Sequence, residues 1–254
     1  MDMFEVGGCV RDEILGIKSK DIDFSVVLSD DDVRLSAVQP YDIMVARLMQ
    51  MGVKIIRDKA NVPIGAEFLT VRGIAPKDFP VHQNRALDFV LARKESDYTD
   101  GRRPDVVEVG DLMDDLRRRD FTMNAIAKDT EGNLIDPFNG VQDINERVIR
   151  AVGTAFDRLN EDALRAVRAL RFSVTKGFRI DKELEFAMET AAVLDSIENK
   201  ISDERIADEL SKMFRFDTVA SLIALGKFPA LTRAMFSGRV SLDATMKQKG
   251  RGRA

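Results

Sequence analysis

The sequence is poor in the residues that form disulfides and histidine metal sites. Its 254 residues include one cysteine, one histidine and no tryptophan. A single cysteine, Cys9, cannot form an internal disulfide, and this fits a reducing compartment. The histidine, His82, has no second imidazole and no cysteine cluster near it in the sequence. We therefore interpret His82 as a structural or surface residue rather than a metal ligand.

Long apolar runs and an excess of positive charge are also missing. No stretch approaches the roughly 18 apolar residues of a membrane span, and no secretory signal is visible, so we expect a soluble, cytoplasmic protein. The formal net charge is -4, with 39 Lys and Arg residues. Overall charge therefore does not predict nucleic-acid binding, although basic side chains can still gather in local patches. A hydrophobic content of 44% predicts a globular chain of one large or two modest domains.

Residues 4–27, FEVGGCVRDEILGIKSKDIDFSVV, predict a strand, a glycine turn, a helix and a second strand. Gly7 and Gly8 let the backbone approach a ligand closely because they have no Cβ. The helix predicted over 10–15 would begin beside them, and amides at a helix N-terminus attract anions. Arg11 adds a guanidinium suited to phosphate oxygens. The stretch therefore predicts a phosphate-binding turn.

Asp21 and Asp23 open the second strand of this stretch. Because residues i and i+2 of a strand share a face, we expect both carboxylates to point to one side while Ile22 and Phe24 point into the core. Adjacent carboxylates repel unless a cation lies between them, and Mg²⁺ is usually held by one or two carboxylates plus substrate phosphates. Asp-x-Asp alone is more typical of a solvated strand edge. Its combination with the preceding Gly-Gly-x-Val-Arg-Asp predicts a site for metal and phosphate.

This combination resembles the signature of the polymerase β-like nucleotidyltransferases, in the class that holds bacterial tRNA CCA-adding enzymes and poly(A) polymerases. The resemblance implies that Asp21 and Asp23 are catalytic and hold Mg²⁺. It also implies that Gly7, Gly8 and Arg11 bind the triphosphate of a nucleotide.

The segment 85–93 predicts a strand with Leu87 and Phe89 on one face and Asp88 on the other. From the residues alone, Asp88 fits an exposed sheet face. The resemblance instead implies that it is the third active-site carboxylate, near the attacking 3′-hydroxyl, at a position where many members have Glu. Residues 93–104 (RKESDYTDGRRP) predict a mobile loop similar to the family's flexible loop, and short strands are also predicted at 53–56 and 66–71.

Residues 115–125, DLRRRDFTMNA, contain three consecutive arginines. Such a run is usually a solvated face, but here it precedes an apolar stretch, 121–127, for which we predict a buried helix. The segment resembles the family motif Asp-Leu-x-Arg-Arg-Asp-Phe-Thr-x-Asn-Ala. The resemblance implies that Arg119 contacts the nucleotide and that Asp120 and Asn124 shape the sugar region.

Residues 160–174, NEDALRAVRALRFSV, predict one amphipathic helix. Taken alone, the pattern indicates core on one side and solvated ion pairs on the other. The stretch resembles the family motif Glu-Asp-x-x-Arg-x-x-Arg. That likeness implies that Asp162 and Arg165 hydrogen-bond the base edge of incoming CTP or ATP. It also implies that Arg168 and Arg171 bind phosphate or neighbouring groups.

We expect an α+β fold made of a polymerase β-like head with a small mixed sheet, followed by an all-helical neck. The head is predicted at 1–150, the neck at 151–236 with helices over 182–194, 202–214 and 218–225, and a basic, flexible tail at 237–254. The resemblance covers about residues 3–215. Because family members usually continue through a helical body and tail, we expect a short form that lacks most of both.

The resemblance implies a metal-dependent RNA nucleotidyltransferase that adds C and A to the tRNA 3′ end from CTP and ATP, releasing pyrophosphate, with Mg²⁺ as cofactor. Partial activities remain open, namely CC addition, A addition or poly(A) synthesis. Two other classes also remain open: a non-catalytic RNA-binding descendant, and a compact nucleotidyltransferase that modifies a protein or small molecule. The sequence makes no prediction of oligomeric state.

Overall fold

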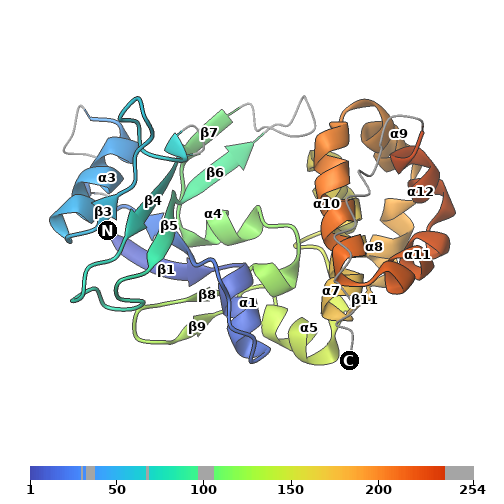
Figure 1. Ribbon diagram of the computed structural model, residues 1–254, viewed down its shortest axis with the longest axis horizontal. Helices are drawn as coiled ribbons and strands as arrows, with labels where there is room; N and C mark the ends of the chain where they lie inside the picture. The colour runs from blue at the N-terminus through green and yellow to red at the C-terminus, as the bar shows by residue number, and fades with distance from the viewer. Residues whose placement is uncertain (30, 33–37, 67–68, 97–105, 238–254) are drawn as a thin grey trace, which may run out of the picture.

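The computed structural model describes residues 1–29, 31–32, 38–66, 69–96 and 106–237. Within these ranges, a mixed sheet occupies one end of the molecule and a group of helices the other (Figure 1). The predicted α+β fold is confirmed. Residues 238–254 of the predicted tail (237–254) and residues 97–104 of the predicted mobile loop (93–104) lie outside the described residues.

The described part of the main sheet has seven strands in the order β3-β4-β5-β2-β1-β8-β9. Strands β2 and β5 are parallel, and the other neighbouring pairs are antiparallel. In the centre, Phe24 of β2 stacks on Phe89 of β5 with ring centroids 5.5 Å apart. The strands are β1 (Asp2–Val6), β2 (Asp23–Val27), β3 (Lys54–Ile55), β4 (Thr70–Ile74), β5 (Ala86–Leu91), β8 (Ala127–Lys128) and β9 (Leu134–Ile135).

The register of these strands places three charged residues in one row. Asp23 of β2 lies opposite Asp88 of β5, and Asp88 lies opposite Arg72 of β4. On the other side of Asp23, the partner is Val6, the last residue of β1. The sheet therefore brings the turn that follows β1 beside the carboxylate of Asp23.

Among the described residues, the helices around the sheet are α1 (Gly8–Ile14), α3 (Pro40–Gln50), α4 (Leu112–Arg117) and α5 (Gly140–Glu146). A separate two-stranded ribbon pairs β6 (Arg93–Ser96) with β7 (Val106–Val109). The prediction of a loop is therefore wrong at 93–96, where cross-strand pairing orders the chain. The strand predicted at 66–71 was placed too early, since β4 begins at Thr70.

The apolar stretch 121–127 is buried as predicted, but the prediction of a helix there is wrong. It contains only a short 3₁₀ turn, η2 (Thr122–Asn124). Phe121 makes a bridge with Ala151 before this turn, and Ala127 enters the sheet after it. The two strand contacts leave too few residues between them for an α-helix.

Helices form the second part of the molecule, and two of them break where sequence patterning predicted continuity. The single helix predicted over 160–174 is wrong: α6 ends at Glu161, Asp162 is extended at φ -150°, and α7 begins at Leu164. The helix predicted over 182–194 also breaks, because Thr190 is extended before α9. The helices are α6 (Ala155–Glu161), α7 (Leu164–Lys176), α8 (Lys182–Met188), α9 (Ala191–Asn199), α10 (Asp203–Phe216), α11 (Thr218–Lys227) and α12 (Pro229–Met235).

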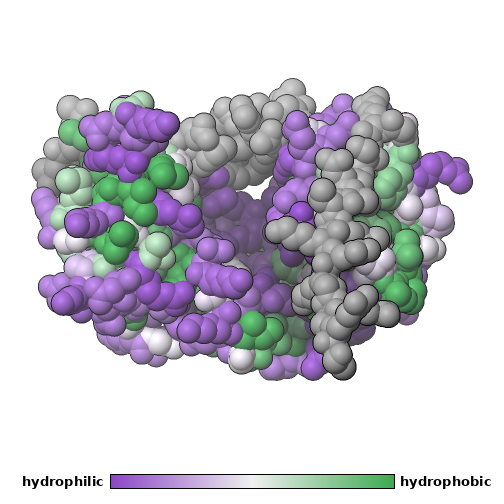
Figure 2. All heavy atoms as spheres, in the orientation of Figure 1, coloured by the Kyte–Doolittle hydropathy of each residue, from purple (hydrophilic) through white to green (hydrophobic). Residues whose placement is uncertain are grey.

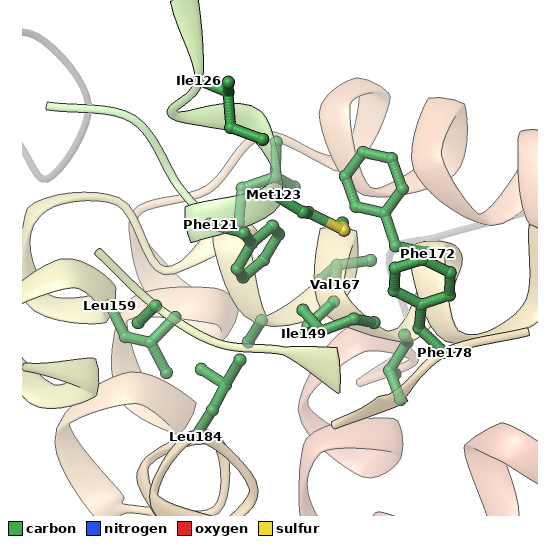
Figure 3. Close-up of a cluster of buried hydrophobic side chains, with 14 of the residues drawn as sticks. Phe121, Met123, Ile126, Ile149, Leu159, Val167, Phe172, Phe178 and Leu184 are labelled. Atoms are coloured by element: carbon green, nitrogen blue, oxygen red, sulfur yellow. The ribbon is translucent and has the colours of Figure 1, made fainter. Parts of the chain in front are cut away.

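One hydrophobic core extends from the sheet into the helices. Figure 3 shows the part of this core around Phe121 and Phe172. The ring of Phe121 meets that of Phe172 of α7 edge-to-face, with centroids 5.9 Å apart. Near the predicted boundary at 150, β10 (Val148–Ile149) pairs in parallel with β11 (Arg179–Ile180). The exact division into head and neck stays a prediction. Across the described ranges, no helix combines the length and the apolar character needed to cross a membrane.

Candidate active site

A pocket of about 450 Å³ lies where the turn after β1 faces α7. Figure 2 shows hydrophilic side chains around the hollow between the sheet-bearing part and the helices. The turn, β2, the segment around η2 and α7 all contribute to the pocket, so residues far apart in the sequence meet there. Its lining consists of Gly7, Gly8, Arg11, Asp23, Arg119, Asp120, Asn124, Arg165, Arg168, Arg171 and Phe172.

Gly7 occupies a backbone conformation that requires glycine. Its φ is +77°, a region that L side chains rarely adopt. A Cβ built there would lie 2.6 Å from Nη1 of Arg119. The missing side chain therefore lets the Arg119 guanidinium pack directly over the turn.

Arg11 of α1 is buried and held from two sides. Its Nε and Nη2 donate to Oδ1 of Asp12 at 2.9 and 2.7 Å. Its Nη1 donates to Oδ1 of Asn124 at 2.5 Å. Because both partners fix the guanidinium plane, Arg11 is presented to the pocket in a defined orientation.

Asp23 and Asp120 are the two carboxylates that line the pocket, and the environment of Asp23 opposes its negative charge. Burial raises the pKa of Asp23, and the charge of neighbouring Asp88 raises it further, while Arg119 opposes both. The charge of Asp21 also contributes to the rise. A cation would relieve this repulsion, so the donor set fits a divalent metal ion.

Asp21 and Asp88 do not line the pocket. Asp21 precedes β2, and 80% of its side chain is exposed, whereas Ile22 and Phe24 are buried as predicted. Asp88 is paired with Arg72 of β4, whose Nε and Nη2 donate to its two oxygens at 2.8 and 2.7 Å.

The described residues contain no group of three or more His, Cys, Asp or Glu side chains arranged to hold a metal ion. The His82 ring lies outside the pocket, with its Nε2 3.0 Å from Oε1 of Glu5. A metal ion at Asp21 and Asp23 would therefore need further oxygen ligands, and nucleotide phosphates and water are the ligands that Mg²⁺ commonly keeps.

A buried carboxylate, Asp115, holds two of the consecutive arginines. Arg119 Nη2 donates to its Oδ2 at 2.8 Å, and Arg118 Nη2 donates to its Oδ1 at 2.5 Å. Burial opposes ionisation of Asp115, but Arg119 and Arg118 outweigh it and hold the pKa of the carboxyl at about 2. Arg118 and Arg119 thus belong to an internal network, whereas Arg117 is exposed, as expected of a solvated face.

A second buried network fixes the arginines of α7. Arg168 Nε and Nη2 donate to Oδ2 of Asp120 at 2.9 and 2.6 Å, and Arg171 Nε donates to buried Glu209 of α10. Burial opposes the charge of Asp120, but Arg168 and a hydrogen bond from Asn124 hold its pKa at about 2. These ion pairs connect α7 to the segment just before η2 and to α10.

Phe172 lies under three of the guanidiniums. The Cζ atoms of Arg171, Arg11 and Arg168 are 3.9, 5.1 and 5.6 Å from the centroid of its ring. An aromatic face attracts cations at these distances. Phe172 therefore gathers positive charge at the pocket, a role that sequence patterning did not reveal because apolar residues of α7 looked like ordinary core.

Asp162 and Arg165 lie near each other in the sequence but have different partners. Arg205 Nη2 donates to Oδ2 of Asp162 at 2.7 Å. Arg165 Nη1 donates to Oε2 of Glu161 at 2.6 Å, and its Nη2 donates to the carbonyl of Arg118 at 3.0 Å. Arg165 reaches the pocket, whereas Asp162 is not among its lining residues.

Most of the predicted site residues therefore meet in one place. The ones that line the pocket are Gly7, Gly8, Arg11, Asp23, Arg119, Arg165, Arg168 and Arg171, and the ones outside its lining are Asp21, Asp88 and Asp162. Sequence reasoning missed two side chains with a direct part in this region, Phe172 and Arg72. Phe172 could have been found from its spacing, because it follows Arg168 by four residues and so lies on the same helix face.

Residues 3–150 match the family described as the poly(A) polymerase head domain. The CCA-adding enzyme of Lactococcus lactis subsp. cremoris strain MG1363 is 40% identical over 214 residues, which is 84% of this chain and 46% of that enzyme. The CCA-adding enzyme of Staphylococcus aureus strain bovine RF122 / ET3-1 is 36% identical over 236 residues, which is 90% of this chain and 51% of that enzyme. The chain spans about half the length of the curated relatives that it matches.

Solved structures show the same relationship. The crystal structure of the Bacillus stearothermophilus CCA-adding enzyme in complex with CTP is 31% identical, with a TM-score of 0.67 over 91% of this chain and 48% of that one. The structure of a tRNA nucleotidyltransferase complexed with a primer tRNA and an incoming ATP analog is 27% identical. Its TM-score is 0.67, over 93% of this chain and 60% of that one.

Proposed function

The chain belongs to the family of the poly(A) polymerase head domain, and on this premise we propose that it adds C and A to the 3′ end of tRNA from CTP and ATP, with release of pyrophosphate. The proposal rests on the arrangement of charged groups in the pocket. The pocket places the under-neutralised carboxylate of Asp23 opposite the guanidiniums of Arg11, Arg119, Arg168 and Arg171. A nucleoside triphosphate with a divalent cation complements both charges.

Asp21 and Asp23 are the residues that would hold Mg²⁺. When bound, the ion would lower the pKa of the attacking 3′-hydroxyl and neutralise charge that develops on the phosphoryl group. Asp23 is suited to this because burial and Asp88 make its unpaired charge costly. Asp88, on the neighbouring strand β5, would assist catalysis near the attacking 3′-hydroxyl.

The turn and the arginines hold the triphosphate. Gly7 and Gly8 offer close backbone approach, and Arg11 and Arg119 offer guanidinium forks that are already oriented by Asn124 and Asp115. Donors fixed before the nucleotide arrives bind it with less loss of conformational entropy. Arg168 and Arg171 extend this basic surface along α7.

Asp162 and Arg165 read the base, one as an acceptor and the other as a donor. Both are held by contacts that a nucleotide would have to share or replace, since Asp162 is paired with Arg205 and Arg165 with Glu161. Residues 1–150 then form the catalytic head, and residues 151–236 form a neck that carries the base-reading residues. We place the protein in the cytoplasm, which its single buried cysteine, Cys9, also favours.

The test is incorporation of labelled CTP and ATP into three tRNAs that end before CCA, after C and after CC, with Mg²⁺ present. Ordered addition that stops at CCA supports the proposal. Addition of only C, addition of only A, or an unbounded A tail would keep the nucleotidyl-transfer chemistry but replace the product. RNA binding without incorporation, with Mg²⁺ or Mn²⁺, would contradict the proposal in favour of a binding module, and transfer only to a protein or small molecule would contradict the RNA substrate.

A further inference from the structure

Arg72 stands at the end of the row of charged residues that the sheet register creates. It lies opposite Asp88 in the β4–β5 pairing, and Asp88 lies opposite Asp23 in the β5–β2 pairing. Side chains directly opposite one another on neighbouring strands share a face and are close enough to interact. The sheet thus places one guanidinium in line with two of the three carboxylates of the site.

The contact between Arg72 and Asp88 uses both oxygens of the carboxylate. Nε donates to Oδ1 at 2.8 Å and Nη2 donates to Oδ2 at 2.7 Å. Nη2 also lies 3.9 Å from Oδ1 of Asp21. Hydrogen bonding to Asp88 and the charges of Asp88, Asp21 and Asp23 raise the pKa of Arg72, so the guanidinium keeps its charge.

An ordinary cross-strand ion pair would explain the Arg72–Asp88 contact without any role at the site. An exposed pair of this kind contributes about 1 kcal/mol or less to stability. Two features distinguish this pair. The side chain of Asp88 is only 20% exposed, and the same guanidinium faces a second carboxylate that belongs to the proposed metal site.

Resting on the proposed function, we propose that Arg72 is a positioning residue that keeps Asp88 out of the ligand set of the metal ion. A bidentate guanidinium occupies the oxygens that a divalent cation would need, and its charge repels that cation. Asp21 and Asp23 then supply carboxylate oxygens to the ion, whereas Asp88 does not. The remaining ligands come from the phosphates of the nucleotide, so that tight metal binding depends on the substrate.

The test measures metal binding to the full chain in the absence of nucleotide, by titration with Mn²⁺ followed by electron paramagnetic resonance. Arg72→Gln frees both oxygens of Asp88 and removes a positive charge, so it should bind Mn²⁺ about tenfold more tightly than the wild type. Arg72→Lys keeps the charge but loses the fork and should show a smaller gain. Arg57→Gln is the matched control, since it removes one surface guanidinium that donates to the Asn61 carbonyl.

The double variant Arg72→Gln/Asp88→Asn separates the freed carboxylate from the lost charge. We expect it to lose the tenfold gain, because the extra affinity comes through Asp88. Retention of the full gain in the double variant would overturn the inference, since the charge of Arg72 alone would then explain it. Equal affinity of wild type and Arg72→Gln would also overturn it.

Two further measurements keep this inference distinct from the proposed function. If Mn²⁺ binds the wild type and Asp21→Asn abolishes that binding, the metal site stands whatever Arg72→Gln shows. If Asp21→Asn binds Mn²⁺ as the wild type does, the proposed metal site fails and this inference fails with it. Thermal unfolding controls for a folding defect. Mn²⁺ should raise the melting temperature of Arg72→Gln by more than that of the wild type, because at a given Mn²⁺ concentration the stabilisation increases with the logarithm of the affinity.

Discussion

The pocket has an arginine wall and a sheet wall, and the charged groups of the two walls are in opposite environments. On the arginine wall, formed by Arg11, Arg119, Arg168 and Arg171, buried carboxylates fix the guanidiniums in place: Asp115 holds Arg119, and Asp120 holds Arg168. On the sheet wall, formed by Asp23 of β2, burial and the charge of Asp88 raise the pKa of Asp23 and so disfavour its ionised form. The arginine wall is therefore complete before any ligand arrives, whereas the sheet wall needs a cation. The difference indicates which part of the site is rigid and which part responds to metal.

Removing the negative charge of Asp23 should have the largest effect on activity. Asp23→Asn removes a metal ligand, so we expect nucleotide incorporation to fall by about a thousandfold or more. The free energy of unfolding should not decrease, because the substitution removes a buried charge that its neighbours repel. Asp78→Asn, on an exposed turn, is the control for loss of one surface carboxylate. Near-normal incorporation by Asp23→Asn would contradict the assignment.

Adding a methyl group at the meeting point of the walls should have the next largest effect. Gly7→Ala places a Cβ 2.6 Å from Nη1 of Arg119 at a positive φ. We expect kcat/KM for CTP to fall about a hundredfold, because displacement of a substrate-binding group by about an ångström costs that much. Gly16→Ala is the matched control, since Gly16 also has a positive φ but has nothing within 4 Å of its Cβ position. Equal losses in both variants would show that backbone strain, and not the Arg119 contact, is responsible.

Replacing the aromatic support of the arginine wall should have a moderate effect. Phe172→Leu keeps an apolar side chain but removes the ring beneath three guanidiniums. We expect KM for CTP to rise about tenfold with little change in kcat. Phe178→Leu is the control, a substitution at another buried phenylalanine, and it should lose a similar amount of stability, about 1 kcal/mol, with KM unchanged. A change in kcat alone for Phe172→Leu would contradict a role in nucleotide binding.

Lowering the pH should break the ion pairs that hold the arginine wall and so decrease the free energy of unfolding. This is the smallest of the four expected effects. The pKa values of Asp115 and Asp120 are about 2, below the ordinary unfolded value near 4. Their stabilising contribution is therefore present above about pH 4 and is lost as pH falls from about 4 to 2, by on the order of 2 kcal/mol each. Urea unfolding at pH 7, 4 and 2.5 measures this loss. A free energy of unfolding that does not fall between pH 4 and 2.5 would contradict the buried ion pairs.

The sequence predicted local chemistry better than the partners of each side chain. Gly7, Gly8 and Arg11 could be placed together because their types fit phosphate, and Arg119 joined them through the family resemblance. The buried faces of β5 and α7 followed from apolar spacing. The break at Asp162 was not predictable from periodicity. The apolar pattern continues through it, while the extended backbone there is accompanied by an ion pair with distant Arg205.

The role of Arg72 was missed for a related reason. The predicted strand ended at residue 71, whereas β4 covers Thr70–Ile74, and a shift of this size removes Arg72 from the sheet altogether. Cross-strand partners depend on register, which sequence patterning alone specifies weakly. Only the three-dimensional pairing shows that Asp88 already has a cation.

A crystal structure of the chain with CTP and Mn²⁺ would test most directly whether the two walls meet around one substrate. We predict anomalous density for Mn²⁺ at Asp21 and Asp23 and a triphosphate in contact with Arg11 and Arg119. A triphosphate bound elsewhere, or Mn²⁺ bound away from Asp23, would contradict it.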